Sequence, residues 1–448
     1  MSKGKLHISK TYVEKGESSV FGECVRLCAN ILISKAEGGG GTSKVLFFEF
    51  EPKYEKYLYH KRSDPFIIGL LSMAMDNEFD IEFDMPISER LSYQLRNHYI
   101  PVIDKYVSFM HAVDLIGPVE NVPIENEGAV GTGCSGGVDS FYTIVTHTGE
   151  KVEKSNCLTH LVFSSSGTLD SPEHEDRIQN NYITLLADIR KISEEANLEL
   201  VACYNNIHHF YNFPYKIFCE FYATIYAASV FALQKLFSVY YESSDWPISE
   251  FDITMKKNGR DDFCINDIFS LQMINTENLT FYSVGECMER TDKIHAISDN
   301  RIANKYLNVC GRRYETDLGD YYNCGECPKC VNTMTILDID RKLDKFEKLF
   351  NMSAFRKKPA KTIAKMMVMK EKRYITDLLA FAKRNGYKFP HFTGFWRYCV
   401  YTPYNFLRIH LRKSNLAKKI YYKLNIDYKL HGFRNAKAED FVKKTSKK

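Results

Sequence analysis

Strand-like and helical stretches alternate through the middle of the chain, and this alternation restricts the possible folds more than any other feature. Four apolar, strand-like stretches are separated by stretches with helical patterns; they read NEGAVGTG, LTHLVFSSSG, LELVACYNN and LFSVYYESS. Alternation of this kind is typical of a parallel sheet covered by helices. We therefore expect an α/β domain over residues 126–340, with helices on both faces of a parallel sheet and ligands at the carboxyl ends of the strands.

Two further segments flank the expected domain. Residues 1–125 combine strand-like stretches such as KVLFFEFE with the helical stretch FIIGLLSMAM, and they predict an N-terminal accessory α/β domain. Residues 341–448 have helical patterns and are basic: residues 351–448 hold 25 Lys and Arg against 5 Asp and Glu, whereas residues 1–350 hold 35 against 51. This asymmetry predicts that the helical C-terminal segment binds a nucleic acid or an acidic protein, or docks on the acidic body of the chain itself.

Three features bear on the compartment. The N-terminal sequence MSKGKLHISK lacks the apolar core of a signal peptide, so a cytoplasmic protein is expected. The longest apolar run, residues 221–233, is shorter than the ~20 residues that span a bilayer, and it predicts a buried helix and no transmembrane segment. The 13 cysteines point to metal binding or redox chemistry, because disulfides are rare in a reducing compartment. The sequence leaves the oligomeric state open, and a homo-oligomer is one of the states that it allows.

Residues 131–140, GTGCSGGVDS, can be interpreted as either of two phosphate-binding loops. Gly131, Gly133 and Gly136 satisfy the G-x-G-x-x-G fingerprint of dinucleotide-binding domains, which also needs an acid at the end of the second strand. The second strand ends in LVFSSSG and offers no acid there. In the alternative, SGGVDS, Asp139 can face a metal-bound pyrophosphate while glycine amides and serine hydroxyls hold the anion. Asp139 therefore favours the second interpretation.

SGGVDS, placed after a strand and before a helix, resembles the signature loop of the ATP pyrophosphatases, the superfamily that includes GMP synthetase, asparagine synthetase and the tRNA lysidine synthetases. The resemblance implies the Rossmann-like fold of the adenine nucleotide α-hydrolases. It also implies that the loop binds ATP and Mg²⁺. The residues that the resemblance assigns to this binding are Ser135, Gly136, Gly137, Val138, Asp139 and Ser140.

A cluster of cysteines follows near the end of the expected domain. Residues 310–330 read CGRRYETDLGDYYNCGECPKC and have the pattern C-x13-C-x2-C-x2-C, with Cys310, Cys324, Cys327 and Cys330 as its cysteines. Four thiolates on tight turns suit tetrahedral Zn²⁺. Because protein ligands fill all four positions, such a zinc knuckle is structural rather than catalytic.

The other glycine and cysteine residues near these motifs are interpreted more simply. Gly325, between two of the cysteines, permits the turn that a knuckle needs. The nine cysteines outside the cluster are scattered, and most are predicted to be small buried apolar residues. Cys134 directly precedes the glycine loop SGGVDS (residues 135–140), and a redox or sulfur-carrying role for this cysteine would require a lowered thiol pKa.

A loop of this type followed by such a cysteine cluster resembles the 7-cyano-7-deazaguanine synthases and their relatives, over residues 126–340. The stretch RTDKI at residues 290–294 is similar to the Thr-Lys segment of that family. The resemblance therefore implies that Lys293 stabilises the negative charge that accumulates on the phosphates. Two details differ from the family: an aspartate separates the threonine from the lysine, and Asn308 and Val309 stand where the family has Trp and Ser.

The resemblance implies an ATP-dependent C–N ligase. A carboxylate attacks the α-phosphorus of ATP, pyrophosphate leaves, and ammonia or another nucleophile captures the acyl-adenylate; in the named family a second activation converts the amide to a nitrile. The carboxylate would belong to a modified nucleobase or to a macromolecule. The resemblance assigns catalysis to Asp139, Ser140 and Lys293. Phe163 and Ser164, at the end of the second strand, would contact the adenosine.

Further interpretations stay open at this point. His208 and His209, after the third strand, can act as acid or base or can be loop residues without a chemical role. An ATP-dependent tRNA-thiolating or other RNA-modifying enzyme would use the same loop together with a cysteine persulfide, and its basic segment would bind RNA. A module that senses ATP and binds nucleic acid through the zinc knuckle and the basic helices would catalyse no reaction.

Overall fold

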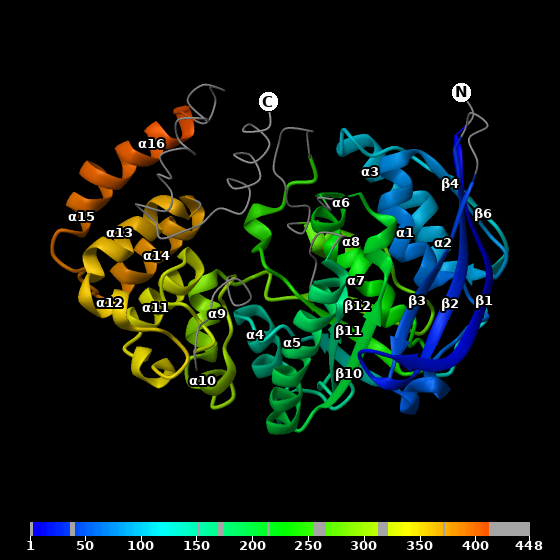
Figure 1. Ribbon diagram of the computed structural model, residues 1–448, viewed down its shortest axis with the longest axis horizontal. Helices are drawn as coiled ribbons and strands as arrows, with labels where there is room; N and C mark the ends of the chain where they lie inside the picture. The colour runs from blue at the N-terminus through cyan, green and yellow to red at the C-terminus, as the bar shows by residue number, and fades with distance from the viewer. Residues whose placement is uncertain are drawn as a thin grey trace. The chain divides into compact units, whose positions relative to one another are not determined.

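The computed structural model describes residues 3–35, 41–150, 152–167, 174–212, 216–254, 266–311, 321–370 and 372–411. The described residues form two compact units, one up to Val309 and the other from Cys310 onward (Figure 1). The predicted domain boundaries after residues 125 and 340 stay predictions. The part of the basic segment beyond residue 411 lies outside the described residues.

The first unit is built on a 10-stranded sheet. From one edge to the other its strands are β12 (Thr280–Val284), β11 (Phe237–Ser243), β8 (Ala129–Gly133), β9 (His160–Ser164), β10 (Glu199–Asn205), β3 (Thr42–Phe50), β2 (Gly22–Ser34), β1 (Gly4–Ser18), β4 (Phe79–Phe83) and β6 (Leu115–Ile116). Neighbours run parallel from β12 to β10, antiparallel from β10 to β1, and parallel from β1 to β6. A separate parallel pair joins β5 (Ile87–Ser88) to β7 (Val119–Glu120). The expected α/β fold with a mostly parallel sheet is confirmed.

The order of the parallel strands marks one place in the sheet as the position for a ligand. β8, β9 and β10 follow one another in one direction, whereas β11 and β12 lie on the other side of β8. This is the 3-2-1-4-5 order of Rossmann-type sheets, in which ligands bind outside the carboxyl ends of the strands where the order reverses. The reversal falls between β8 and β11, and the glycine loop is the segment that leaves β8.

Helices cover both faces of this sheet. The helices of the first unit are α1 (Asp64–Asn77), α2 (Glu89–Gln94), α3 (Ile100–Tyr106), α4 (Val138–Thr146), α5 (Glu175–Ala196), α6 (Lys216–Glu220), α7 (Tyr222–Phe231), α8 (Asp267–Gln272), α9 (Arg290–Ile297) and α10 (Ala303–Tyr306). Connections between parallel strands are right-handed. Helices α4 and α5 connect β8, β9 and β10 in one direction across the sheet, so they lie on one face. Helices α7 and α8 connect β10 to β11 and β11 to β12 in the opposite direction, so they lie on the other face.

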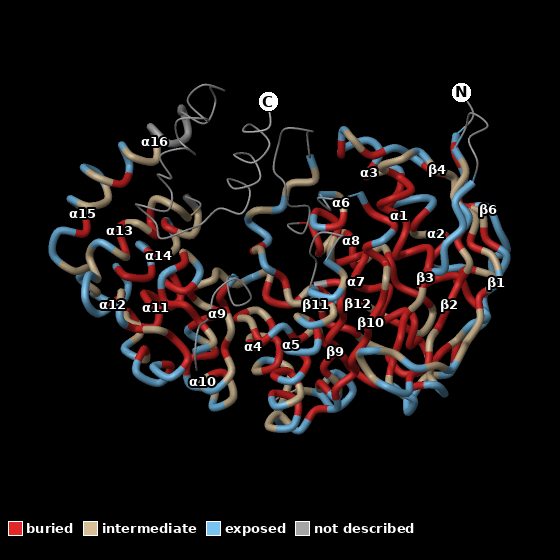
Figure 2. Tube along the Cα trace, viewed as in Figure 1, coloured by how far each residue is buried: buried red, intermediate tan, exposed pale blue. Residues whose placement is uncertain are grey.

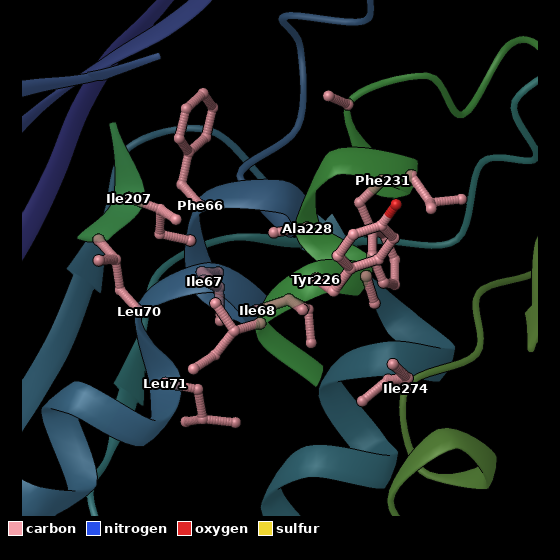
Figure 3. Packing of buried hydrophobic residues seen from close by; sticks show 14 of the residues in the cluster. Phe66, Ile67, Ile68, Leu70, Leu71, Ile207, Tyr226, Ala228, Phe231 and Ile274 are labelled. Carbon is pink, nitrogen blue, oxygen red and sulfur yellow. The ribbon is translucent and has the colours of Figure 1, made fainter. Parts of the chain in front are cut away.

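Helix α1 comes from the N-terminal segment and packs directly on α7. Figure 3 shows Ile68 of α1 in one apolar layer with Ala228 and Phe231 of α7. A Cβ at Gly69 would lie 2.6 Å from Ile207 Cδ1 and 3.2 Å from Ala228 Cβ, so glycine allows this close approach. Buried apolar residues of β1 to β4 and of β8 to β12 belong to the same core cluster, within the red parts of Figure 2.

Local sequence patterns explain the buried helices. Helix α5 places Ile178, Tyr182 and Ile189 on its buried face at helical spacing, and it ends where Asn197 adopts a φ of 53°. The apolar run at residues 221–233 forms the buried helix α7, as predicted. The residues just before this run form a separate short helix, α6.

The second unit is helical where it is described. Its helices are α11 (Pro328–Ile339), α12 (Ser353–Lys357), α13 (Pro359–Met369), α14 (Lys372–Arg384), α15 (Thr393–Phe395) and α16 (Thr402–Leu411). Helix α11 is buried along residues 330–337 and packs on α13 and α14. The Tyr387 hydroxyl donates to Asp338 Oδ2 at 2.5 Å and ties the end of α14 to α11. Among the described helices of both units, none has the length and apolar character that crossing a bilayer requires.

Arg62 is a buried cation that joins distant parts of the first unit. Its side chain is 1% exposed, its Nε donates to Glu120 Oε1 at 2.7 Å, and its Nη1 lies 3.4 Å from Glu277 Oε2 and 3.7 Å from Asp64 Oδ2. Burial raises the pKa of Asp64 to about 6, although the charge of Arg62 opposes this rise. Removal of one partner from such a buried group leaves charges without compensation.

Replacing Arg62 by methionine is expected to lower the free energy of unfolding by about 3–5 kcal/mol, because Asp64 and Glu277 would lose their buried counter-charge. Urea unfolding followed by circular dichroism measures the change. Arg190→Met is the matched control: Arg190 pairs with Glu51 at 2.7 Å but is 42% exposed. That variant should lose less than about 1 kcal/mol, and equal losses in the two variants would contradict the argument from burial.

Candidate functional site

The glycine loop connects β8 to α4 in a compact turn. Gly137 immediately precedes α4, so the free amides at the start of the helix face the loop. The Ser135 N–H donates to Ser140 Oγ at 3.2 Å, and the two hydroxyl oxygens are also 3.2 Å apart. The Gly137 N–H donates to Ser135 Oγ at 3.3 Å. Amides and hydroxyls therefore converge on one small region, as an anion site requires.

Gly136 is required by the conformation of this loop. Its φ is 70°, and a Cβ there would make only ordinary contacts, the nearest 3.6 Å from Ile192 Cδ1. The left-handed backbone, not a lack of space, therefore demands glycine. Its carbonyl accepts the Asn308 N–H at 2.8 Å, which ties the segment after α10 to the loop. Val138 begins α4 with a fully buried side chain, so it offers the site only its backbone.

Asp139 lies between two cations of α9. Arg290 Nη1 is 2.8 Å from Asp139 Oδ2, and Lys293 Nζ is 3.1 Å from Asp139 Oδ1. Lys293 is buried, and its Nζ also donates to the carbonyl of Ser244. Burial acts to raise the pKa of Asp139, but the charges of Arg290 and Lys293 outweigh burial and lower this pKa below its usual value. The carboxylate is therefore ionised.

Gly285 leaves room for the buried end of Lys293. A Cβ at Gly285 would lie 2.9 Å from Lys293 Cε and 3.1 Å from its Nζ. Gly285 also has a φ of 91°, which residues with a side chain rarely adopt. Both the space and the backbone conformation therefore favour glycine beside this lysine.

Two further acids, which the sequence did not indicate, lie near Asp139. Glu242 is in β11, Asp245 follows that strand, and both line the same cavity as Asp139. Desolvation by the surrounding protein, with the like charge of Asp139, raises the pKa of Asp245. Asp245 is exposed, so water in the cavity offsets part of this rise. Glu242 is half-buried, and burial together with the charge of Asp245 raises its pKa to about 8.

A cavity of about 200 Å³ opens at the carboxyl ends of β8, β9 and β11. The residues that were predicted to bind nucleotide and that line it are Ser135, Asp139, Ser140, Phe163 and Ser164. Lys293 joins this group through its ion pair with Asp139. The structure therefore brings the predicted loop, strand end and lysine together.

The cavity also has lining residues that the sequence did not indicate. They are Leu185, Tyr222, Tyr226, Glu242, Ser243, Asp245 and Asp267. A signal for the acids was present, because β11 ends in YYES and the aspartate follows two residues later. Strand ends beside a reversal of strand order are where ligands bind in such sheets. Arg290 had a signal as well, since it precedes Lys293 by one helical turn.

Phe163 and Ser164 end β9 in a tightly packed environment. The Phe163 ring stacks on Tyr182, with ring centroids 5.0 Å apart and an interplanar angle of 9°. Ser164 Oγ lies 3.0 Å from Ser229 Oγ and accepts from Asn205 Nδ2 at 3.0 Å. The hydroxyl of Ser164 therefore belongs to a buried polar network. Contact of this strand end with adenosine stays a prediction.

Three other residues considered from the sequence differ in their environments. The imidazoles of His208 and His209 both face Glu175 and do not line the cavity. Cys134 does line the cavity, but it is buried, and burial raises the pKa of its thiol to about 12. A reactive thiolate at Cys134 is therefore disfavoured.

The four predicted cysteines form a cluster in the second unit. Cys310, Cys324, Cys327 and Cys330 are buried, and their Sγ atoms all lie within 4.8 Å of one another. The Sγ of Cys330 is 3.3 Å from that of Cys327 and 3.9 Å from that of Cys324. Thiolates held ~2.3 Å from a tetrahedral zinc ion lie ~3.8 Å apart, so this donor set fits a metal such as zinc.

The backbone around the cysteines supports a knuckle. The Cys327 N–H donates to Cys324 Sγ at 3.3 Å, and the Cys330 N–H donates to Cys327 Sγ at 3.4 Å. Gly325 has a φ of 70°, and a Cβ there would lie 1.8 Å from the Asn351 carbonyl oxygen, so glycine is required as predicted. Such amide-to-sulfur bonds orient metal ligands. The close set of four cysteines is confirmed, and zinc itself stays a proposal.

Glu242 predicts a pH dependence of stability. Its carboxyl has a pKa of about 8 in the folded chain against 4.5 for an unperturbed group, so the folded state binds more protons between these values and stability falls as the pH rises through them. Glu242→Gln removes this contribution. The thermal midpoint of this variant should therefore rise relative to that of the unaltered protein as the pH increases from about 5 to about 9. Glu17→Gln, at an exposed position of β1, is the control, and a pH-independent difference for Glu242→Gln would contradict the assignment.

Comparisons with known proteins identify no relative of this chain. No family model, no curated protein and no solved structure matches it. The assignment of a function to the cavity therefore rests on its residues and their geometry.

Proposed function

We propose that this protein is an ATP-dependent ligase, which adenylates a carboxylate and passes the acyl group to a nitrogen nucleophile, with AMP and pyrophosphate as products. One observation carries the proposal: the SGGVDS loop leaves β8 where the strand order reverses, and its Asp139 lies between Arg290 and Lys293 beside a cavity. An anion-binding loop, an ionised carboxylate and two fixed cations at one strand end are the components that nucleotidyl transfer requires.

The loop provides the pyrophosphate site. The amides of Gly136 and Gly137, the hydroxyls of Ser135 and Ser140, and the N-terminus of α4 all favour an anion. These groups belong to one short turn, so they are held close together before a ligand binds. Binding of the departing pyrophosphate therefore costs little reorganisation.

Asp139 and Asp245 would hold Mg²⁺ beside this loop. Their carboxylate oxygens are the hard ligands that Mg²⁺ prefers, and both residues line the cavity. When bound, Mg²⁺ neutralises charge on the phosphates and on the leaving group. The charge of the ion would also oppose the desolvation and the like charge of Asp139, which together raise the pKa of Asp245.

Lys293 and Arg290 stabilise the charge that develops on the phosphates. Both are positioned by Asp139 before the substrate enters, and Lys293 has a buried side chain. Fixed positive charges in a site of low dielectric lower the energy of a transition state more than mobile surface charges do. This arrangement supports the role that the resemblance to the 7-cyano-7-deazaguanine synthases implies for Lys293.

The reaction consists of two displacements. A carboxylate oxygen forms a bond to the α-phosphorus while the bond to the pyrophosphate oxygen breaks. The nitrogen nucleophile then attacks the acyl carbon, AMP leaves with the electron pair of the C–O bond, and the nitrogen loses a proton. Positioning and electrostatics are sufficient for these steps, so no protein nucleophile is needed. A modified nucleobase or a macromolecule-linked acid is the proposed substrate, and a second activation would convert an amide product to a nitrile.

Sulfur transfer to tRNA is the weaker alternative. It needs a thiolate that carries sulfur beside the loop, and Cys134 is the cysteine in that position. The raised thiol pKa of Cys134 opposes thiolate formation near neutral pH. The two ATP-dependent reactions differ in product, because one joins nitrogen to an acyl group and the other adds sulfur to RNA.

The test of the proposal is a product assay. The full chain is incubated with ATP, MgCl₂, ammonium and a panel of carboxylates that includes deazapurine acids, and the nucleotide products are separated. AMP and pyrophosphate in equal amounts, formed only with a carboxylate present, are expected. Formation of ADP and phosphate would contradict the proposal. ATP binding without turnover across the panel would favour an ATP-sensing module, and thiolated RNA after addition of a sulfur donor would favour the tRNA-modifying alternative.

The described part of the second unit favours a nucleic acid as the anionic partner. Phe392, Phe395 and Tyr398 are exposed aromatic residues, and cations lie beside aromatic rings here, with Arg397 at 5.0 Å from the Tyr398 ring centroid and Lys361 at 5.2 Å from that of Trp396. Exposed aromatic rings among cations are the combination that binds single-stranded nucleic acid. Binding to single-stranded RNA that weakens steeply with salt is expected, and salt-insensitive binding would contradict electrostatic capture.

A further inference from the structure

A second group of metal-ligand side chains lies in the first unit, and it shares no residue with the cysteine cluster of the second unit. Glu175, His208 and His209 each direct one ligand atom to the same place, and these three atoms lie within 4.8 Å of one another. His208 Nε2 is 3.2 Å from Glu175 Oε2, and His209 Nε2 is 3.0 Å from the same oxygen. Two imidazoles therefore contact the same carboxylate oxygen, whereas a simple surface ion pair has only one partner on each side.

The backbone holds these residues in place. Glu175 is the first residue of α5, and the two histidines lie in a 3₁₀ turn, Ile207–Phe210, that follows β10. The side chain of Asn206 accepts the Phe47 N–H at 3.0 Å and donates to the Val45 carbonyl at 2.8 Å, which fixes the start of that turn to β3. The ligand atoms are therefore presented by anchored elements, as a preformed metal site requires.

The separations agree with those of a metal site. Imidazole nitrogens and carboxylate oxygens held ~2.1 Å from a tetrahedral ion lie ~3.4 Å apart. The observed separations of 3.2 and 3.0 Å need only a small expansion to reach this value. His208 is buried, whereas Glu175 is half-buried and His209 is exposed, so an ion can enter from the solvent side.

An outer partner orients the carboxylate. The Tyr204 hydroxyl donates to Glu175 Oε1 at 2.6 Å and leaves Oε2 to the two histidines. Metal-binding carboxylates and imidazoles commonly have such hydrogen-bond partners, which fix the ligand orientation. Tyr204 is at the carboxyl end of β10 and His208 follows soon after it, so a short stretch of chain supplies both a ligand and its support.

We infer that Glu175, His208 and His209 form a binding site for a divalent transition metal, Zn²⁺ first among them, which is separate from the cysteine cluster. Two nitrogens and one carboxylate oxygen are a donor set that Zn²⁺ accepts. Three protein ligands leave one tetrahedral position for water or for a donor atom of a substrate, unlike the four thiolates, which fill every position. This site therefore has the open coordination of a reactive or substrate-binding metal.

The test measures metal content in the full chain. The protein is dialysed against Zn²⁺, and the metal bound per chain is determined by mass spectrometry. The His208→Ala/His209→Ala variant is expected to bind one ion fewer per chain than the unaltered protein. Glu175→Gln, which keeps the size of the side chain, should weaken the affinity of this site by at least about 10-fold, and Tyr204→Phe by about 10-fold. His7→Ala is the matched control, because His7 pairs with Asp84 at 2.8 Å without a second histidine.

Cobalt distinguishes the two sites. Co²⁺ on the cysteines gives a sulfur-to-metal charge-transfer band in the near ultraviolet, which the histidine and glutamate variants should leave unchanged. The visible bands of a cobalt ion with nitrogen and oxygen ligands should disappear in the same variants. The inference would be overturned if the double histidine variant retained the full metal content and all cobalt bands. It would also be overturned if the sulfur-to-metal band accounted for all of the cobalt bound by the unaltered protein. Circular dichroism of each variant excludes loss of fold as the cause.

Discussion

The Asp139→Asn protein is expected to form AMP and pyrophosphate about 10²- to 10³-fold more slowly than the unaltered protein, a loss of roughly 3–4 kcal/mol of transition-state stabilisation. The substitution keeps the size of the side chain but removes its charge. Asp139 would then no longer hold Mg²⁺ or keep Arg290 and Lys293 in position. The measurement is pyrophosphate release under saturating ATP with the carboxylate that gives the highest rate.

Two comparisons make this result specific. Asp84→Asn, which alters an exposed aspartate next to β4, should leave the rate unchanged. Lys293→Gln should slow the reaction as well, and the double variant with Asp139→Asn should lose little more than the slower single variant, because residues that act as a unit have non-additive effects. Nucleotide cleavage at the full rate by Asp139→Asn would refute the role of the loop.

Removal of metal from the cysteine cluster is expected to unfold much of the second unit. Structural zinc sites contribute about 10 kcal/mol or more to folding, because the site does not exist in the unfolded chain. Cys330 lies in the first turn of α11, which is buried against α13 and α14, so the metal site and the helical core share one element. A strong chelator, or Cys330→Ser, should abolish the thermal transition of these helices and lower the helical circular dichroism signal.

The control for this experiment is within the same unit. Cys399→Ser changes an exposed cysteine outside the cluster and should alter neither the metal content nor the transition. The first unit has its own core, so its thermal transition should persist after chelation. A chelated chain that retained both transitions would show that four cysteines pack stably without an ion.

Elements with strong local patterns could be predicted from the sequence. The apolar strands β8 to β11 and the amphipathic helix α5 were expected because each has a run of residues with one clear period. The hairpin of β1 and β2 was not expected, although Leu6 and Ile8 alternate with more exposed residues. The antiparallel pairing of β3 with β10, at Glu49 with Tyr204, joins segments far apart in sequence, and no local pattern reports such a pairing.

The same distinction applies to the candidate site. The loop from Ser135 to Ser140 is contiguous, so an anion-binding role could be proposed for it from a short stretch of sequence. Lys293 was indicated by a resemblance alone. Asp245 and Arg290 were missed because only the topology of the sheet brings them to Asp139. Strand β11 lies beside β8, which places Asp245 near the loop, and α9 places Arg290 there as well.

The pairing of β10 with β3 has a consequence for any shortened form of the protein. A chain that began near residue 126 would leave β10 with unpaired amides and carbonyls along an open edge, and it would strip α1 from the apolar surface of α7. Bare strand edges and uncovered apolar helices recruit other chains. The segment from residue 126 onward is therefore expected to aggregate when it is expressed by itself, because it would lack the strand and the helix of residues 1–125 that cover these surfaces.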